Sequence, residues 1–245
     1  MKKQAVTLLF LIVWSIFIKV DSTARASTVT YDIGVKVGDW AKYEFSVDWN
    51  SSPPQPEPFF VQEARQVNYI YVEVKEISGT NITIQETIYY KNETSATKIY
   101  MGDIASYTGN LSLLIIAKNL KEGDKIYESP IAPSINETLP RSYAGFTRMV
   151  NRLTVQEGAG ILYLIIYNHY WDQETGFLCE MLIEKIETND YNTTLRIREV
   201  MIATNLWEPL IPTWVVPVIF IIIVSIIFIY LIHKRRLKKR LRLRR

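Results

Sequence analysis

Two uncharged, strongly apolar runs, one near each end of the chain, constrain this sequence more than any other feature. The first covers residues 5–18, and the second covers residues 213–232. As an α-helix, the 20 residues of the second run would extend about 30 Å, which is the thickness of the hydrocarbon core of a bilayer. The first run is shorter and has different flanks, so the two runs predict different roles.

The first run has the parts of a secretory signal peptide. It follows the basic pair Lys2-Lys3, and it precedes Ala24-Arg25-Ala26, which has the A-x-A form of a cleavage site. We therefore predict a signal peptide over residues 1–26, with cleavage before Ser27. An uncleaved anchor helix is the alternative, and the 14-residue length of the run disfavours it.

The second run predicts a single C-terminal transmembrane helix over residues 213–232. Residues 233–245 follow it with nine Lys and Arg residues and no acidic residue. Because Lys and Arg beside a span stay on the cytoplasmic side, the tail is predicted to be cytoplasmic and residues 27–208 to lie outside the plasma membrane. A signal peptide predicts the same orientation. The side chains expected at the membrane interfaces are Trp207, Trp214, Tyr230, Lys234, Arg235, Arg236, Lys238, Lys239 and Arg240.

The basic tail also predicts a partner. Cations next to an anionic membrane surface contribute about 1 kcal/mol each, so we expect the tail to contact anionic lipid headgroups. Three alternatives stay open for this end of the chain. They are a buried core helix in place of the span, a tail that binds nucleic acid, and a sorting signal that a transpeptidase removes.

The segment between the two runs is acidic. Residues 27–208 hold 24 acidic and 15 basic residues, a net charge of −9, although the whole chain has a formal net charge of +3. Phosphate contacts need a basic surface, so nucleic acid is not an expected partner of this segment. The negative charge favours solubility and is compatible with cationic ligands.

Asparagine sequons are dense in the same segment. An N-x-[ST] pattern marks an acceptor of N-glycosylation, and such acceptors lie on surface loops of exported proteins. Most of the six sequons fall where turns are expected, which indicates an exported glycoprotein. The candidate glycosylation sites are Asn50, Asn81, Asn92, Asn110, Asn136 and Asn192.

Alternating apolar residues predict a mainly β, antiparallel domain. Residues 70–77 and 82–90 alternate on either side of the turn sequence Ser78-Gly79-Thr80-Asn81, which is typical of a hairpin. We expect the strands to form a meander or a half-barrel-like sheet. Further strands are expected over residues 96–101, 160–171, 177–188 and 193–203.

Little helix is expected in this domain. Residues 59–66 or 142–151 are expected to supply a short helix. Two Gly-Asp pairs, Gly38-Asp39 and Gly123-Asp124, are expected to form turns that lead into strands.

Three short motifs resemble a known group of proteins. Residues 34–43 (GVKVGDWAKY), 119–124 (NLKEGD) and 170–176 (YWDQETG) are similar to segments of archaeal cell-surface proteins. That resemblance implies a signal peptide, a β-rich outer domain, one C-terminal span and a basic tail, and it implies no particular activity. The hairpin at residues 171–176 also resembles one in lipoprotein-carrier-type half-barrels, which implies an apolar cavity for acyl chains.

The sequence shows no catalytic or metal-binding motif. His169 is the only histidine of residues 27–208, and Cys179 is the only cysteine of the chain. We therefore expect no metal, no cofactor and no internal disulfide, and we expect both side chains to be ordinary residues of β strands. Asp172 and Glu174 have the spacing to flank a calcium ion or to form an acid pair, but the pattern favours a cap on their turn.

Three classes of function follow from these observations. The first is a membrane-anchored cell-surface protein whose outer domain binds a lipid, a glycan or a protein. The second is a structural or adhesive glycoprotein of the cell envelope. The third is a surface enzyme that uses Asp172 and Glu174. The first is preferred, with no catalysis, because an aromatic-rich β domain without a catalytic motif is typical of a binding module.

Overall fold

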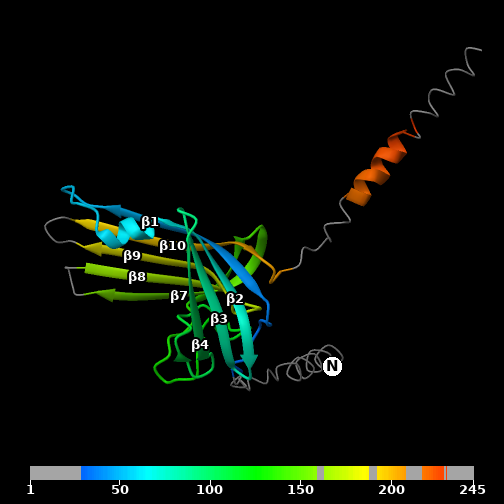
Figure 1. Ribbon diagram of the computed structural model, residues 1–245. Helices are drawn as coiled ribbons and strands as arrows, with labels where there is room; N and C mark the ends of the chain where they lie inside the picture. Colours follow the sequence, from blue (N-terminus) through cyan, green and yellow to red (C-terminus); the bar gives the residue numbers. More distant parts are fainter. Residues whose placement is uncertain (1–28, 159–162, 188–191, 208–216, 229, 231–245) are drawn as a thin grey trace, which may run out of the picture. The chain divides into compact units, whose positions relative to one another are not determined.

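A computed structural model describes residues 29–158, 163–187, 192–207, 217–228 and 230 of the chain. Figure 1 draws these residues in colour. The compact unit that contains the β strands begins at Tyr31. The predicted signal peptide, Trp214 and the basic tail from Lys234 to Arg245 lie outside the described residues, so their roles stay predictions.

Ten strands form one antiparallel sheet in the described part of the chain, in the order β5-β4-β3-β2-β1-β10-β9-β8-β7-β6. This sheet confirms the expectation of a mainly β, antiparallel domain. β-Branched and aromatic residues, which fit a pleated and half-buried surface, are abundant in it. The strands are β1 (Trp40–Asn50), β2 (Val67–Ser78), β3 (Asn81–Tyr90), β4 (Ser95–Asp103), β5 (Thr108–Gly109), β6 (Glu137–Tyr143), β7 (Phe146–Gly158), β8 (Tyr163–Asp172), β9 (Leu178–Glu187) and β10 (Thr193–Thr204).

The first and last strands in sequence pair in the centre of the sheet. Ala41 lies opposite Thr204, and Asn50 lies opposite Thr194. Outward from this pair, β1 continues into β2 to β5, and β10 continues into β9 to β6. The domain is therefore two antiparallel meanders that share a central pair of strands.

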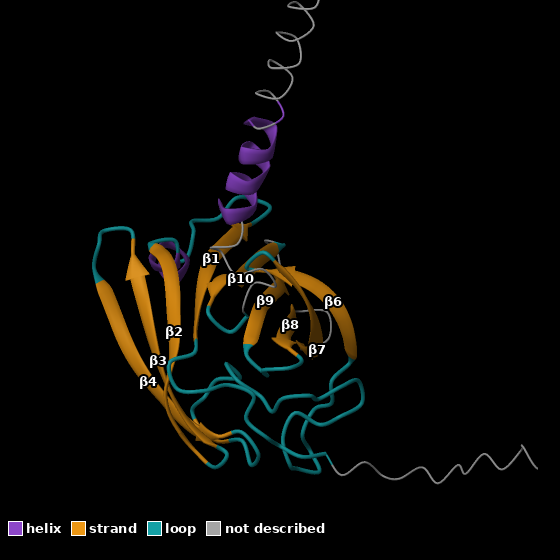
Figure 2. Ribbon diagram, turned by 90° about the vertical axis from the view of Figure 1, so that its right-hand side faces the viewer, coloured by secondary structure: helices purple, strands orange, loops and turns teal. Residues whose placement is uncertain are grey.

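The C-terminal meander is strongly curved (Figure 2). Strands β6 and β10 stand at opposite ends of this meander, yet they come into contact. Tyr143 of β6 donates a hydrogen bond to Glu180 of β9 at 2.9 Å, and Arg198 of β10 donates one to the same carboxylate at 2.8 Å. Glu180 is 3% exposed, so a buried carboxylate links three strands of this curl.

The hydrophobic core lies on the face of the central strands that bears Tyr43, which we term the inner face. Cross-strand partners share a face, so Ile70 and Met201, which lie opposite Tyr43, belong to it as well. The long connection between β5 and β6 adds to this core, and Trp171 of β8 donates from its indole Nε1 to the carbonyl of Leu113 at 2.7 Å. The buried apolar residues of the connection are Leu111, Leu114, Ile115, Ile116, Ala117, Leu120, Ile126, Ala132 and Ile135.

One of the two helix expectations is confirmed, and the other is wrong. Helix α2 spans Phe59–Ala64 and buries Val61. Residues 142–151, in contrast, form the hairpin of β6 and β7. Ala144 and Gly145 have φ of 49° and 84°, which is the conformation of a tight two-residue hairpin turn. This turn sets the local structure despite residues with moderate helix propensity on both sides.

The C-terminal apolar run is described in part. Residues 217–228 are helical, and their side chains are exposed. Among the described residues, no helix has the length and apolar character needed to cross a membrane. The transmembrane helix over residues 213–232 therefore stays a prediction.

Candidate functional site

The turn after β8 is held by a dense set of polar contacts. Asp172 accepts hydrogen bonds from the backbone N–H and the hydroxyl of Thr175, each at 2.9 Å. Arg148 donates to the other carboxylate oxygen of Asp172 at 2.8 Å and also pairs with Glu174. The hydrogen bond to Asp172 raises the pKa of Arg148 above its usual value. Because both oxygens of Asp172 are occupied and its side chain is 1% exposed, this residue caps the turn, as the sequence favours.

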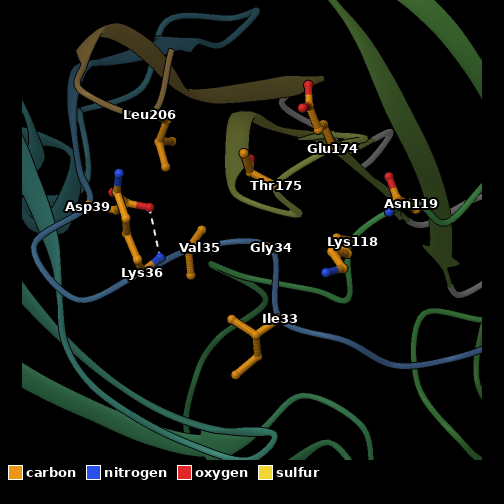
Figure 3. A pocket seen from close by; sticks show the side chains of 10 residues that line it. All are labelled: Ile33, Gly34, Val35, Lys36, Asp39, Lys118, Asn119, Glu174, Thr175 and Leu206. Atoms are coloured by element: carbon orange, nitrogen blue, oxygen red, sulfur yellow. Dashed lines mark hydrogen bonds between the residues drawn. The ribbon is translucent and has the colours of Figure 1, made fainter. Parts of the chain in front are cut away.

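Two adjoining hollows open beside this turn, and we term them together the turn hollow. The first has a volume of about 550 Å³ and is shown in Figure 3. The second has a volume of about 570 Å³, and the two share Glu174, Thr175 and Leu206. The first is also lined by Ile33, Gly34, Val35, Lys36, Asp39, Lys118 and Asn119, and the second by Gly145, Phe146, Thr147, Arg148 and Trp207.

A glycine brings the N-terminal segment against the turn. A Cβ at Gly34 would lie 2.6 Å from the carbonyl oxygen of Thr175 and 2.7 Å from that of Glu174. No side chain fits at that distance, so only glycine allows this approach. The wall of the turn hollow therefore depends on segments that are more than 130 residues apart in the sequence.

Asp39 lines the turn hollow and has a side-chain oxygen without a hydrogen-bond partner among the described residues. Its Oδ2 accepts a hydrogen bond from the backbone N–H of Lys36 at 2.8 Å. Its Oδ1 is buried and has no hydrogen-bond partner among the described residues. A buried acceptor without a partner costs about 1–3 kcal/mol, which marks Asp39 as a group that a ligand donor would satisfy.

A second turn, at Gly123-Asp124, has the same conformation as the turn that carries Asp39. Gly38 and Gly123 have φ of 88° and 87°, and the backbone N–H of Lys121 donates to Asp124 Oδ2 at 3.0 Å, as that of Lys36 does to Asp39. The two Gly-Asp turns expected from the sequence are thus confirmed. Only the first leads into a strand, because Lys125 forms an isolated bridge with Ser134 instead.

Trp207, expected at a membrane interface, packs within the β domain. It is 6% exposed, lies edge-on to Phe146 with ring centroids 5.8 Å apart, and has Arg148 over its ring at 5.4 Å. Its indole Nε1 is buried and has no hydrogen-bond partner in the described residues. Trp207 thus lines the second part of the turn hollow and carries a buried donor that has no partner among the described residues.

A second group of polar residues lies on the inner face, and sequence reasoning missed it. Glu199 of β10 is 5% exposed, and its Oε1 has no hydrogen-bond partner among the described residues. Burial, followed by the charge of Glu86, raises the pKa of Glu199 to about 8. Glu86 of β3 accepts a hydrogen bond from the hydroxyl of Tyr100 at 3.0 Å. In the sequence both glutamates fit an alternating strand, so no pattern separates them from solvent-facing residues.

His169 and Cys179 are both buried in strands. The ring of His169 stacks on Trp171 at 5.4 Å, and burial lowers the pKa of His169 to about 4. Its Nδ1 has no hydrogen-bond partner in the described part of the chain. The thiol of Cys179 is fully buried and donates to the carbonyl of Phe177 at 3.7 Å. Burial raises the pKa of this thiol, so Cys179 is a small core residue, as expected.

All six sequon asparagines are exposed and lie at strand ends or in turns. In Asn92, Asn110 and Asn136, the side-chain oxygen accepts a hydrogen bond from a backbone N–H, which fixes the orientation of the amide. The amide nitrogen, which is the atom that N-glycosylation modifies, takes no part in that hydrogen bond. The exposed positions are Asn50, Asn81, Asn92, Asn110, Asn136 and Asn192.

Within the described residues, no group of three or more His, Cys, Asp and Glu side chains is placed to hold a metal ion. Comparison of the chain with protein-family models, curated proteins and solved structures gave no match. The function is therefore argued from the geometry of the turn hollow.

Proposed function

We propose that this chain is a single-pass, membrane-anchored cell-surface protein whose outer β domain binds a carbohydrate in the turn hollow. The observation that carries the proposal is the buried, unpartnered carboxylate oxygen of Asp39 in the wall of a polar hollow. The proposal also includes a signal peptide, a C-terminal span and a basic cytoplasmic tail that contacts anionic lipids. These parts of the proposal are supported by the sequence alone.

The lining of the turn hollow suits a ligand with many hydroxyl groups. Asp39 and Glu174 supply carboxylates, Asn119 supplies an amide, and Lys36 and Lys118 supply ammonium groups. A hydroxyl both donates and accepts hydrogen bonds, so adjacent sugar hydroxyls match acceptors and donors that lie close together. The volume of about 550 Å³ falls in the range of small-ligand sites.

A rigid frame supports binding in preference to catalysis. The Asp172–Arg148 pair holds the turn that carries Glu174 and Thr175, which lowers the ordering cost of binding. The same contacts disfavour the carboxylate enzyme, because Arg148 engages both of its candidate acids.

The second candidate function, a structural or adhesive envelope glycoprotein, rests on a separate observation. The six exposed sequons would cover much of the domain with glycans. Deletion of the gene followed by imaging of the cell envelope tests it: an unchanged envelope contradicts a structural role.

The carbohydrate proposal is tested with the full-length chain in detergent micelles and a panel of neutral and acidic oligosaccharides. Saturation-transfer NMR is expected to detect binding of at least one panel member, and Asp39→Ala is expected to weaken it by about tenfold or more, the cost of about one charge-assisted hydrogen bond. Asp124→Ala is the matched control, because Asp124 makes the same turn contact away from the hollow. Equal loss in both variants, or no binding by any panel member, contradicts the proposal.

A further inference from the structure

Another hollow lies between helix α2 and the turn that joins β3 to β4, and we term it the helix hollow. Its volume of about 540 Å³ falls in the range of small-ligand sites. Its lining includes Phe60 and Ala64 of α2, Val67 of β2, Tyr90 of β3, and Asn92 and Thr94 of the turn. Because Asn92 is a sequon asparagine, the helix hollow and a candidate glycosylation site share a wall.

Backbone hydrogen bonds hold the two walls of the helix hollow together. The N–H of Lys91, in the turn, donates to the carbonyl of Gln66 at 2.8 Å, which ties the turn to the segment after α2. Within the turn, the N–H of Tyr90 donates to the carbonyl of Thr94 at 2.9 Å. Val61 of α2 is fully buried and anchors the helix, which lies in contact with β1. Walls that the fold holds in place lower the ordering cost of binding.

The side chain of Asn92 is oriented with its amide nitrogen available for modification. Its Oδ1 accepts hydrogen bonds from the backbone N–H of Thr94 at 3.1 Å and from the hydroxyl of Thr94 at 2.6 Å. Asn92 is exposed, and both of these hydrogen bonds use the oxygen and leave Nδ2 aside. N-glycosylation attaches a sugar to this nitrogen. The first sugar of a glycan on Asn92 would therefore begin at the wall of the helix hollow.

The other walls of the helix hollow match the surface of a sugar. Phe60 of α2 is 52% exposed, and Tyr90, two residues before Asn92, is half-buried. A sugar ring presents polarised C–H groups, which pack against the negative face of an aromatic ring. Glu63 and Gln66 are exposed and line the same hollow, where they offer acceptors and a donor for hydroxyl and acetamido groups.

We propose that the helix hollow holds the first sugar of an N-linked glycan on Asn92. The glycan comes from a lipid-linked oligosaccharide phosphate. Nδ2 of Asn92 forms a bond to C1 of the first sugar, and the bond between C1 and the phosphate oxygen breaks. The amide loses one proton to a base of the transferase, and the lipid phosphate leaves. This inference rests on the export of the domain that the proposed function includes, and it does not depend on carbohydrate binding in the turn hollow.

Asn81 is a sequon asparagine in different surroundings. It is exposed at the β2–β3 turn and is not among the residues that line the helix hollow. A Cβ added at Gly79 of the same turn would have no atom within 4 Å, so the space beside this turn is open. A glycan on Asn81 is therefore expected to extend into solvent, and the two glycans should differ in their accessibility to an enzyme.

The test compares release of the two glycans from the native, full-length chain. The chain is produced in cultured animal cells, which attach N-acetylglucosamine as the first sugar, and is purified in detergent micelles. A peptide-N-glycosidase then cuts the bond between sugar and asparagine in water enriched in oxygen-18, and mass spectrometry measures release at each asparagine. Relative to the denatured chain, the native fold is expected to slow release at Asn92 about tenfold more than at Asn81.

Variants of α2 test whether the sugar lies in the helix hollow. Phe60→Ala removes an exposed ring from the wall and is expected to abolish most of the protection at Asn92, whereas Phe60→Tyr keeps an aromatic ring and should retain it. Phe59→Ala is the matched control, because Phe59 is 72% exposed and is not among the lining residues. This control should behave as the wild type does, and all three variants should keep the wild-type circular dichroism spectrum.

The occupancy of the asparagines separates failure of this inference from failure of the proposed function. An unmodified Asn92 in a chain that carries a glycan on Asn81 overturns the inference and leaves export intact. A chain without a glycan at any sequon contradicts both. Equal protection at the two asparagines overturns the inference alone, as does protection at Asn92 that Phe60→Ala leaves unchanged or that Phe59→Ala removes to the same extent.

Discussion

At the scale of single residues, the domain uses similar carboxylates in different ways according to their contacts. Asp172 has a partner at each oxygen and holds a turn, whereas Asp39, which lines a hollow, has a partner at Oδ2 and none at Oδ1 among the described residues. Oε1 of Glu199 has no partner among the described residues, and burial, followed by the charge of Glu86, raises the pKa of Glu199 to about 8. Burial and partners, and not residue type, separate structural carboxylates from candidate binding groups.

The Asp172 cap gives a stability prediction. Asp172→Ala removes four hydrogen bonds and leaves Arg148, whose side chain is only 25% exposed, without its buried partner. We expect a loss of about 3 kcal/mol in the free energy of unfolding, measured by urea denaturation. Glu174→Gln is the control, because its side chain is 74% exposed, and surface pairs contribute less than about 1 kcal/mol. Similar losses in the two variants would show that burial of Asp172 is unimportant.

Glu199 gives a prediction for the pH dependence of stability. Its pKa is about 8 in the folded state against an ordinary value of 4.5, so the folded state binds a proton more tightly than the unfolded state does. The stabilisation of the folded state by this bound proton is fully present below pH 4.5 and is lost as the pH rises through 8. The wild type should therefore lose stability relative to Glu199→Gln over this range, by a few kcal/mol at most. Thermal denaturation at pH 4.5, 6 and 8 measures it, and a constant difference between the two proteins contradicts it.

At the scale of elements, turns decide which segments become hairpins. Residues 142–151 have no strong strand pattern, yet Ala144 and Gly145 both adopt positive φ and reverse the chain between β6 and β7. Gly38 and Gly123 likewise produce two copies of one turn from the pattern Lys-x-Gly-Asp. Local turn chemistry thus overrides weak propensity in the flanking residues.

The β6–β7 turn predicts a stabilising substitution. Ala144 has φ of 49°, a conformation that disfavours alanine, whereas Asn-Gly is the preferred pair for this type of turn. Ala144→Asn should raise the free energy of unfolding by about 0.5–1 kcal/mol in urea denaturation. Ala203→Asn, within β10, is the control and should lower it, because asparagine is unfavourable in strands. A destabilised Ala144→Asn would show that this turn is not strained.

At the scale of the whole molecule, charge and sequons distinguish an acidic domain from a basic C-terminal segment. The acidic domain carries the exposed sequons, and the basic residues gather after the second apolar run. This division predicts that the chain is glycosylated outside the cell and that its tail is inside. A C-terminal epitope tag should be protected from protease in intact cells, while deglycosylation should lower the mass of the domain. A tag that is accessible in intact cells would contradict this orientation.

Hairpins were predictable from the sequence because they are local. The pair β2/β3 and its turn follow from alternating residues and a Gly-containing turn only a few residues long. The pairing of β1 with β10 was not predictable, because its partners are more than 140 residues apart and many strands have equally suitable patterns. The contribution of the long connection from Leu111 to Ile135 to the core was also not predictable, because its apolar residues have neither the period of a strand nor that of a helix.

By itself, the sequence determined the mainly β class, the Gly-Asp turns, the cap at Asp172 and the burial of Cys179, because each depends on neighbouring residues or on hydrophobicity alone. Only the tertiary structure decided that Asp39 and the turn after β8 line one hollow, and that the charge of Glu86 acts on Glu199. Those arrangements depend on the order and curvature of ten strands, which place residues from distant segments on one surface. Whether a carboxylate oxygen has a partner among the described residues depends on that arrangement, and no spacing in the sequence predicts it.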